Sequence, residues 1–169
     1  MKKNEEDFSR IVRENKGTIY TVCHMFADCQ DEADDLFQEV LLNLWKGFGS
    51  FRGDSKVSSW IYRVALNTCI SAERKSQRHK TERLSMDINL YEDKDDDSRQ
   101  VQQLHKLIGR LGVIDRAIVL LWLENMSYEE IAGILGISAK NVSVKLVRIK
   151  EKLIRMNFAE QSKVTQGNK

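Results

Sequence analysis

Basic side chains are concentrated near the end of the chain, in residues 140–155. This stretch carries six Lys or Arg and a single acid, Glu151. A row of ammonium and guanidinium groups neutralises nucleic-acid phosphates and donates hydrogen bonds to base edges. A solvated helix whose charges only keep it soluble has the same composition. The preceding sequence favours the first interpretation, because it predicts how the basic stretch is held.

Two helix starts and one helix stop organise residues 126–153. Ser127 is followed three residues later by Glu130, the pattern of a capping box in which each side chain binds a free backbone N–H. Gly136 supplies the left-handed residue that ends a helix, and Ser138 can cap the next one. Two short helices separated by so few residues must cross steeply. We therefore predict a helix-turn-helix, whose second helix enters the DNA major groove.

The second of these helices has one apolar stripe, with intervals of four, three and four residues: Val142, Leu146, Ile149 and Leu153. Such a stripe must face a core. All other side chains then point away from it, and they include Lys140, Asn141, Ser143, Val144, Lys145, Val147, Arg148, Lys152 and Arg155. This outward set is our candidate for binding duplex DNA.

A second candidate site combines aromatic rings, basic side chains and an amide. Residues 46–60 are rich in glycine and serine and predict a loop, after which Ser58 or Ser59 can cap a helix. Arg63, Asn67 and Arg74 would face outward from that helix. Rings stack on unpaired bases, cations bind the backbone and an amide can read a base edge, so the pattern is typical of a single-strand site. The alternative is that the rings of Phe51 and Trp60 only fill the core beneath the loop.

An acidic helix is predicted to precede this loop, with Asp31 as its N-cap and further acids at the positive end of its dipole. Ala33, Leu36, Phe37, Val40, Leu41 and Leu44 would form its buried face. Its exposed face would carry Asp35, Gln38, Glu39 and Asn43 side by side. Taken alone, this pattern indicates a well-capped surface helix.

The whole chain has helical periods and no proline, which predicts an all-α protein. A first helix, bent or interrupted near Gly17, would begin it. We expect two small helical domains, residues 1–77 and 101–155, followed by a tail over 156–169. A flexible linker, 78–100, would join them, because its polar composition cannot bury a core.

Composition argues against an enzyme or a metalloprotein. His24, His79 and His105 are scattered, and no nucleophile, carboxylate pair or phosphate loop has a catalytic spacing. Cys23, Cys29 and Cys69 are odd in number and unpatterned, as expected of reduced core thiols. With no second ligand pair near Cys23 and His24, we expect no metal and no cofactor.

The net charge of +2 conceals alternating acidic and basic blocks, which indicate several partners. The start, MKKNEEDF, lacks the apolar run of a signal peptide, and no segment is long and apolar enough to span a bilayer. We therefore expect a cytoplasmic protein without membrane insertion.

Together, these motifs resemble those of bacterial extracytoplasmic-function (ECF) sigma factors. The resemblance rests on DEADDLFQEVLLNLW, SFRGDSKVSSWIYRVALNT and LENMSYEEIAGILGISAKNVSVKLVRIKEKL, which occur in the family's order and spacing. It implies a dissociable subunit of RNA polymerase. The N-terminal domain would bind core polymerase and the melted −10 promoter element, and the C-terminal domain would bind the −35 element as duplex. The family also implies an anti-sigma factor as a partner.

The resemblance assigns roles to three groups of residues. Asp35, Gln38 and Glu39, with Asn43 on the same face, match the helix that docks on the polymerase clamp. The melting and −10 segment is matched by Phe51, Arg52, Trp60, Tyr62, Arg63 and Asn67, with Arg74 outward beyond them, and Asn67 is expected nearest a flipped-out base. Ser143, Val144, Val147 and Arg148 match positions that meet −35 bases, which leaves Lys140, Lys145 and Lys152 as phosphate contacts.

Some positions depart from the family pattern. Ser143 stands where relatives often have Arg or Lys, and Lys140–Asn141 replaces a common Gly-Thr, so the −35 sequence cannot be transferred. Leu111–Gly112 replaces Leu-Pro, which puts the rigidity of that turn in question. A stand-alone helix-turn-helix regulator is the alternative function, but it would leave the acidic helix and the aromatic loop unused.

Overall fold

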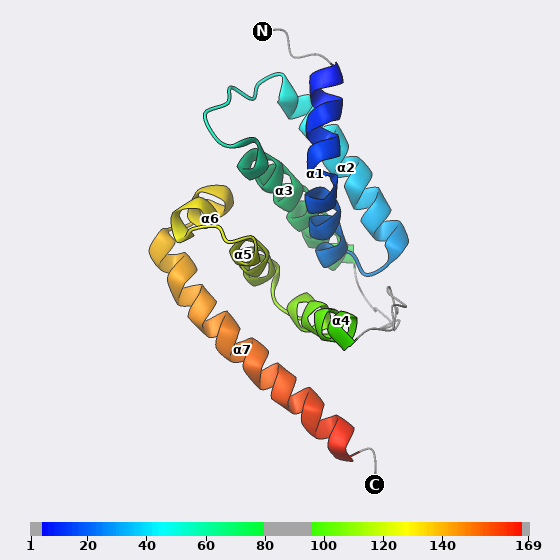
Figure 1. Cartoon of the computed structure of the whole chain (residues 1–169), viewed down its shortest axis with the longest axis vertical. Helices are drawn as coiled ribbons and strands as arrows, with labels where there is room; N and C mark the ends of the chain where they lie inside the picture. Colours follow the sequence, from blue (N-terminus) through cyan, green and yellow to red (C-terminus); the bar gives the residue numbers. More distant parts are fainter. Residues whose placement is uncertain (1–4, 80–95, 167–169) are drawn as a thin grey trace. The chain divides into compact units, whose positions relative to one another are not determined.

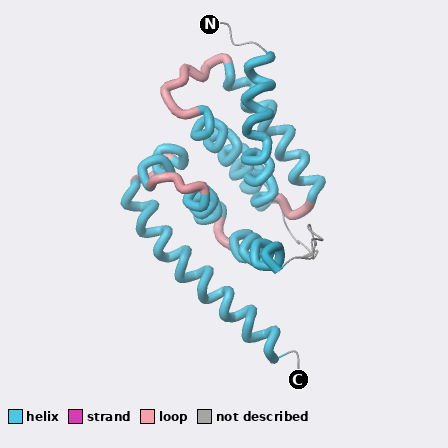
Figure 2. The backbone as a smooth tube through the Cα atoms, viewed as in Figure 1, coloured by secondary structure: helices cyan, strands magenta, loops and turns pink. Residues whose placement is uncertain are grey.

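The computed structural model describes residues 5–79 and 96–166, and within these ranges the ordered elements are seven helices (Figures 1 and 2). The chain divides into two compact units, Met1–Leu90 and Tyr91–Lys169. The predicted all-α class is confirmed. None of the described helices combines the length and hydropathy needed to cross a membrane.

The N-terminal unit consists of α1 (Glu5–Phe26), α2 (Gln30–Phe48) and α3 (Val57–His79), each packed against the other two (Figure 1). Each helix contributes an apolar stripe because its large apolar residues recur at intervals of three and four. The fully buried side chains at the centre are Ile19, Val22, Val40, Leu44, Ile61 and Leu66. Hydrophobic burial of these stripes holds the three helices together.

Helix boundaries in this unit differ from the predictions. The N-cap position of α2 is Cys29, so Asp31 lies inside the first turn and is not the cap. The carboxylate of Glu32 instead accepts a hydrogen bond from the Asp28 backbone N–H at 2.7 Å. Gly17 does not interrupt α1, which is one continuous helix.

The predicted loop over residues 46–60 is shorter than expected. Since α2 continues to Phe48 and α3 starts at Val57, Ser58 and Ser59 belong to the first turn of α3 and do not cap it. Gly47 does not end α2, because the helix continues to Phe48, whose ring is buried in the domain.

The C-terminal unit consists of α4 (Asp96–Gly109), α5 (Val113–Leu123), α6 (Tyr128–Leu135) and α7 (Ala139–Gln166). Helix α7 packs against each of the other three. The central side chains are Ile108, Ile118, Leu121, Ile131, Val142 and Leu146, all at most 1% exposed. Burial of one side of α7 by three partners fixes which of its sides faces outward.

The predicted linker and tail are both partly helical. Helix α3 extends to His79 and α4 begins at Asp96, so both ends of the expected linker belong to helices, and residues 80–95 lie outside the described ranges. Helix α7 continues beyond 155 to Gln166. There, Gln103 Nε2 on α4 donates to Asn157 Oδ1 at 2.8 Å. The C-terminal domain is therefore longer than its apolar pattern indicated.

The turn between α4 and α5 is held by a buried arginine. The guanidinium of Arg116 donates to the carbonyl oxygens of Gly109 and Leu111, at 2.9 and 3.2 Å. It thereby satisfies carbonyl groups that the end of α4 leaves without helical partners. Gly112 is the N-cap of α5, with φ −60° and ψ 157°. This is the conformation that a proline ring imposes, so the turn keeps the expected geometry without the proline.

The conformation of Gly112 generates a stability prediction. Replacing Gly112 with Pro restricts the unfolded chain while the folded backbone already has the required φ, so the unfolding free energy of the C-terminal unit should rise by about 0.4–1 kcal/mol. Hydrogen exchange of the α5 and α7 amides would measure the change. Gly112→Ala, which keeps the N–H, is the matched control. A loss of protection in the proline variant alone would show that this N–H, or the freedom of Leu111, is needed.

Candidate nucleic-acid interface

The helix-turn-helix has the caps that the sequence predicted. Ser127 Oγ accepts from the Glu130 N–H at 3.2 Å, and the Glu130 carboxylate accepts from the Ser127 N–H at 2.9 Å. Gly136 is left-handed at φ 70°, and Ser138 Oγ accepts from the Asn141 N–H at 3.1 Å. These contacts satisfy backbone groups at both ends of the turn, so the path from α6 into α7 is tightly specified.

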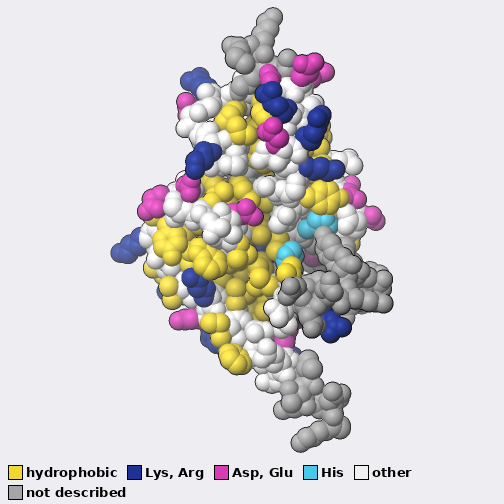
Figure 3. Space-filling view, in the orientation of Figure 1, with side chains coloured by type: hydrophobic (Ala, Val, Ile, Leu, Met, Phe, Trp, Pro, Cys, Tyr) yellow, Lys and Arg dark blue, Asp and Glu magenta, His cyan; other side chains and the backbone are white. Residues whose placement is uncertain are grey.

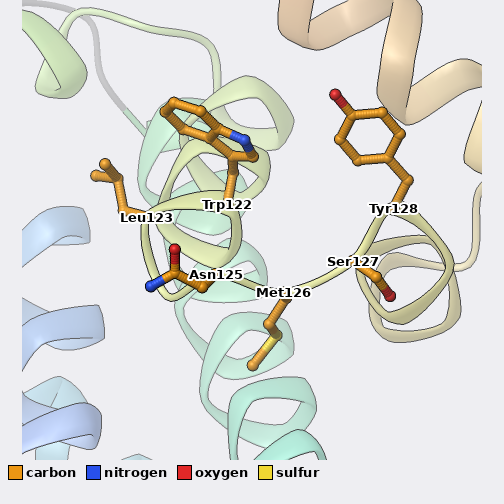
Figure 4. Close-up of a pocket in the computed structure, with 6 residues that line it drawn as sticks. All are labelled: Trp122, Leu123, Asn125, Met126, Ser127 and Tyr128. Carbon is orange, nitrogen blue, oxygen red and sulfur yellow. The ribbon is translucent and has the colours of Figure 1, made fainter.

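The turn before α6 is built around Asn125, whose φ of 58° is the left-handed region that asparagine tolerates. Figure 4 shows Trp122 and Tyr128 rising on the same side of this turn while Met126 points the other way. The ammonium of Lys150 lies 4.3 Å from the centre of the Trp122 ring. Apolar side chains gather over α5 and the neighbouring part of α7 on the face drawn in Figure 3. Lys150 is therefore engaged within the domain through its contact with the Trp122 ring.

The outward face of α7 agrees with the predicted wheel. Val142, Leu146 and Ile149 are at most 2% exposed, which turns the opposite side of the helix to solvent. The exposed residues there are Lys140, Asn141, Val144, Val147, Arg148 and Lys152, while Ser143 and Lys145 are half-buried. The apolar side chains of Val144 and Val147 thus project among basic side chains. This combination suits contact with thymine methyl groups beside phosphates.

Lys145 has a partner that the sequence did not reveal. Its Nζ lies 3.0 Å from Oδ1 of Asp115, in the first turn of α5. The two residues are thirty positions apart. Only the packing of α5 against α7 brings them together, so no local sequence signal could have found the pair.

The outer face of α3 also forms as predicted. Arg63, Asn67 and Arg74 are exposed, whereas Ile61 and Leu66 are buried. Intervals of four and seven residues place the three polar side chains on one side of the helix. The structure therefore presents two cations and an amide together.

The aromatic residues of this region are less available than predicted. Tyr62 is only 5% exposed, so in this conformation its ring packs in the domain and offers no face for a base. The rings of Phe51 and Trp60 stack with their centres 4.9 Å apart and are half-buried, while Arg52 is exposed in the loop. Filling of the core beneath the loop, the alternative interpretation for Phe51 and Trp60, thus describes both rings in part. Tyr62, for which that alternative was not raised, is the ring that is buried.

The predicted polar face of α2 is only partly as expected. Asp35, Gln38 and Glu39 are exposed. Asn43 is half-buried, and its Nδ2 donates to Thr68 Oγ1 on α3 at 3.0 Å. Asn43 therefore does not continue the exposed face, because its side chain binds within the unit.

A polar network that sequence reasoning missed holds the start of α2 against α1. The Tyr20 hydroxyl donates to the Asp34 carboxylate at 2.5 Å, and Gln30 donates to the same oxygen at 2.9 Å. The hydrogen bond lowers the pKa of Asp34 and raises that of Tyr20. Burial lowers the pKa of the neighbouring His24 and raises that of Glu32. The network fixes the helix turn from which Asp35 projects.

Two of the three cysteines lie in the core, as expected, and Cys29 does not. Cys23 and Cys69 are fully buried and Cys29 is half-buried, all unpaired by disulfides. A hydrogen bond to Cys23, together with burial, raises the pKa of the Cys69 thiol, which keeps it protonated and unreactive. Within the described ranges, no three potential ligands lie close enough to hold a metal ion.

Comparisons with known proteins identify the family. Residues 11–79 match Sigma-70 region 2, and residues 101–153 match Sigma-70 region 4. The chain is 30% identical to the ECF RNA polymerase sigma factor SigW of Bacillus subtilis, over 90% of each chain. The chain belongs to the ECF sigma factors. This protein is therefore an alternative sigma factor, a transcription-initiation factor and not an enzyme.

Other relatives agree with this assignment. The ECF sigma factor SigM of Mycobacterium tuberculosis is 27% identical over 88% of this chain and 76% of its own. Solved structures share the fold: CnrH in complex with the cytosolic domain of CnrY has a TM-score of 0.69 at 20% identity, covering 92% of this chain and 90% of that one. The sigma factor RpoE in complex with the anti-sigma factor NepR from Bartonella quintana has 0.70 at 22% identity, covering 88% and 94%.

The hydrogen bond of Asn43 separates fold from function on the region-two face. Asn43→Ala leaves Thr68 without this donor, so the N-terminal unit should lose about 1 kcal/mol of unfolding free energy. Hydrogen exchange of the α2 and α3 amides would report the loss. Gln38→Ala, an exposed amide on the same helix, is the control and should change exchange little. Equal effects of the two substitutions would contradict the structural role of Asn43.

Proposed function

We propose that three exposed helix faces divide the work of this sigma factor. The α2 face of Asp35, Gln38 and Glu39 binds core RNA polymerase, the α3 face around Asn67 binds the melted −10 element, and the α7 face binds the −35 element as duplex. The observation that carries the proposal is the orientation of α3 and α7. Because the apolar stripe of each helix is buried, its basic and amide side chains face solvent. The match to both sigma-70 regions supports it.

The α3 face has the chemistry needed for a single strand. Arg63 and Arg74 supply cations for the backbone on either side of Asn67, whose amide both donates and accepts. Extruding a base from the stack costs a few kcal/mol, which contacts in a pocket must offset. Since Tyr62 is buried, the stacking ring is to come from Phe51 or Trp60, after the pair separates, and not from Tyr62.

The α7 face has the chemistry needed for a duplex. Lys140 and Lys152 are exposed near its two ends and can contact phosphates, while Arg148 can donate two hydrogen bonds to a guanine. Val144 and Val147 are 42% and 57% exposed and offer apolar contact to thymine methyl groups. Specificity would thus rest on one arginine and two valines.

Two further properties belong to the same proposal. A factor that works on core polymerase acts in the cytoplasm, and we place this chain there. We also propose an anti-sigma factor as its regulator, since a structural neighbour of the same fold was solved with the anti-sigma factor NepR. A stand-alone regulator would require no region-two domain, yet residues 11–79 match one. The general test is transcription in vitro with core polymerase and a promoter library. The proposal is refuted if core polymerase with this protein initiates at no promoter that core polymerase alone does not use.

Asn67→Ala tests the −10 assignment. Loss of one good base contact, roughly 1–3 kcal/mol, should reduce open-complex formation by about tenfold or more while core binding stays unchanged. Permanganate reactivity of unpaired thymines measures opening, and co-purification measures core binding. Gln38→Ala should weaken core binding, and open-complex formation should recover when core polymerase is raised to saturation. If Asn67→Ala weakens both readouts equally, its assigned role is wrong.

Arg148→Ala tests the −35 assignment. The substitution should relax sequence preference at one −35 position, as judged by initiation from a promoter library, with a loss of roughly 1–3 kcal/mol at the preferred base. Lys150→Ala removes the same charge from the same helix, but Lys150 lies over Trp122 and should leave the preference unchanged. A broadened preference in the Lys150 variant instead would place the reading face on the wrong side of α7.

A further inference from the structure

One basic residue on the DNA-facing helix is paired with an acid of its own domain. Lys145 Nζ and Asp115 Oδ1 are 3.0 Å apart, and the side chains are 35% and 30% exposed. Asp115 lies in the first turn of α5, which is held against α7 by the buried core of the unit. The fold therefore holds the Asp115 carboxylate beside the edge of the outward face of α7.

The other basic side chains on this face are not paired with an acid in the way that Lys145 is. In the described part of the chain, Lys140, Arg148 and Lys152 have no acid within ion-pair distance, and all three are exposed. Each of them presents a full positive charge to an approaching duplex. The Asp115–Lys145 pair has no net charge, and this stays true when either side chain moves.

The local charge decides what the pair contributes to DNA binding. Affinity for a duplex rises with the number of phosphates that a protein neutralises, because each releases counterions. If Lys145 turns to a phosphate, Asp115 is left beside the same phosphate and repels it. A lysine with this partner adds little to the count, although its position on the helix would otherwise allow a contact.

The Asp115–Lys145 pair is expected to contribute little to the stability of the fold. Partly exposed ion pairs contribute little to folding, since solvent screens them and two side chains lose freedom. The first turn of α5 is also held by Arg116, whose guanidinium donates to the carbonyl oxygens of Gly109 and Leu111. The pair has a larger effect on the electrostatic field at the DNA face than on the fold.

We propose that Asp115 is a built-in counter-charge that withholds Lys145 from DNA phosphate and so weakens non-specific binding of the free sigma factor to duplex DNA. This inference rests on the proposed DNA-binding role of α7. It replaces the expectation that Lys145 is a phosphate contact. Specific recognition through Arg148 and the valines is left intact, so the counter-charge raises the ratio of specific to non-specific affinity.

The test measures how affinity of the full-length protein for a labelled random-sequence duplex depends on KCl concentration, by fluorescence anisotropy. The variants are Asp115→Asn, Lys145→Gln and the double variant. We expect Asp115→Asn to steepen the slope of log affinity against log salt by about 0.9, the value of one added phosphate contact, and to tighten binding several-fold. Lys145→Gln alone should leave the slope of the wild type, and the double variant should match it.

Two controls keep the result interpretable. Glu124→Gln removes an equal charge from the far end of α5, away from the pair, and should leave the slope unchanged. Asp115→Ala should repeat the Asp115→Asn result, which separates loss of charge from the choice of side chain.

Other results would overturn the inference. If Lys145→Gln alone lowers the slope by about 0.9, Lys145 already binds phosphate in the wild type. If Asp115→Asn acts equally with and without Lys145, the two charges are independent and no lysine is withheld. Lys140→Gln distinguishes failure of the underlying proposal: an unchanged slope there as well would mean that α7 is not the DNA-binding helix.

Discussion

Burial of one side of α7 is the constraint on which the DNA-binding half of the molecule depends. Val142, Leu146 and Ile149 can be removed from water together only at one rotation of the helix about its axis. That rotation decides which side chains reach solvent. The caps at Ser127 and Ser138 add the second constraint, because they fix where α6 and α7 begin. Hydrophobic burial thus sets the face, and hydrogen bonds set the register along the chain.

The N-terminal unit applies the same principle to two faces at once. The outward sides of α2 and α3 are assigned to different partners, yet the two helices pack on each other directly. The Asn43–Thr68 hydrogen bond crosses their interface, and the Tyr20–Asp34 contact ties α2 to α1. Buried or half-buried polar contacts of this kind favour one packing arrangement over others, because misaligned helices would leave them unsatisfied. The two faces that we propose bind polymerase and the −10 element are therefore held in a fixed relation.

Local signals in the sequence predicted the parts of the structure that local physics controls. The capping box of Ser127 and Glu130 and the left-handed Gly136 depend only on residues within a few positions, and all were found. The cap at Asp31 failed because an acid is equally favourable within the first turn, where the helix dipole attracts it. The burial of Tyr62 could not be predicted for another reason: the family pattern gives its residue type, but its 5% exposure depends on packing.

The outward face of α7 carries an unusual balance of charge and apolar surface for a helix expected to read DNA. With Lys145 balanced by Asp115, the face has fewer free cations than its composition indicates. With Lys145 withheld as proposed, this domain alone gains less electrostatic attraction to any duplex. Joined to a second reader on one chain, and ordered by polymerase, it needs only modest affinity, because the second binding event is intramolecular. In the proposed function, a face that relies on Val144, Val147 and Arg148 then contributes mainly discrimination, while occupancy of the promoter comes from joining the two readers.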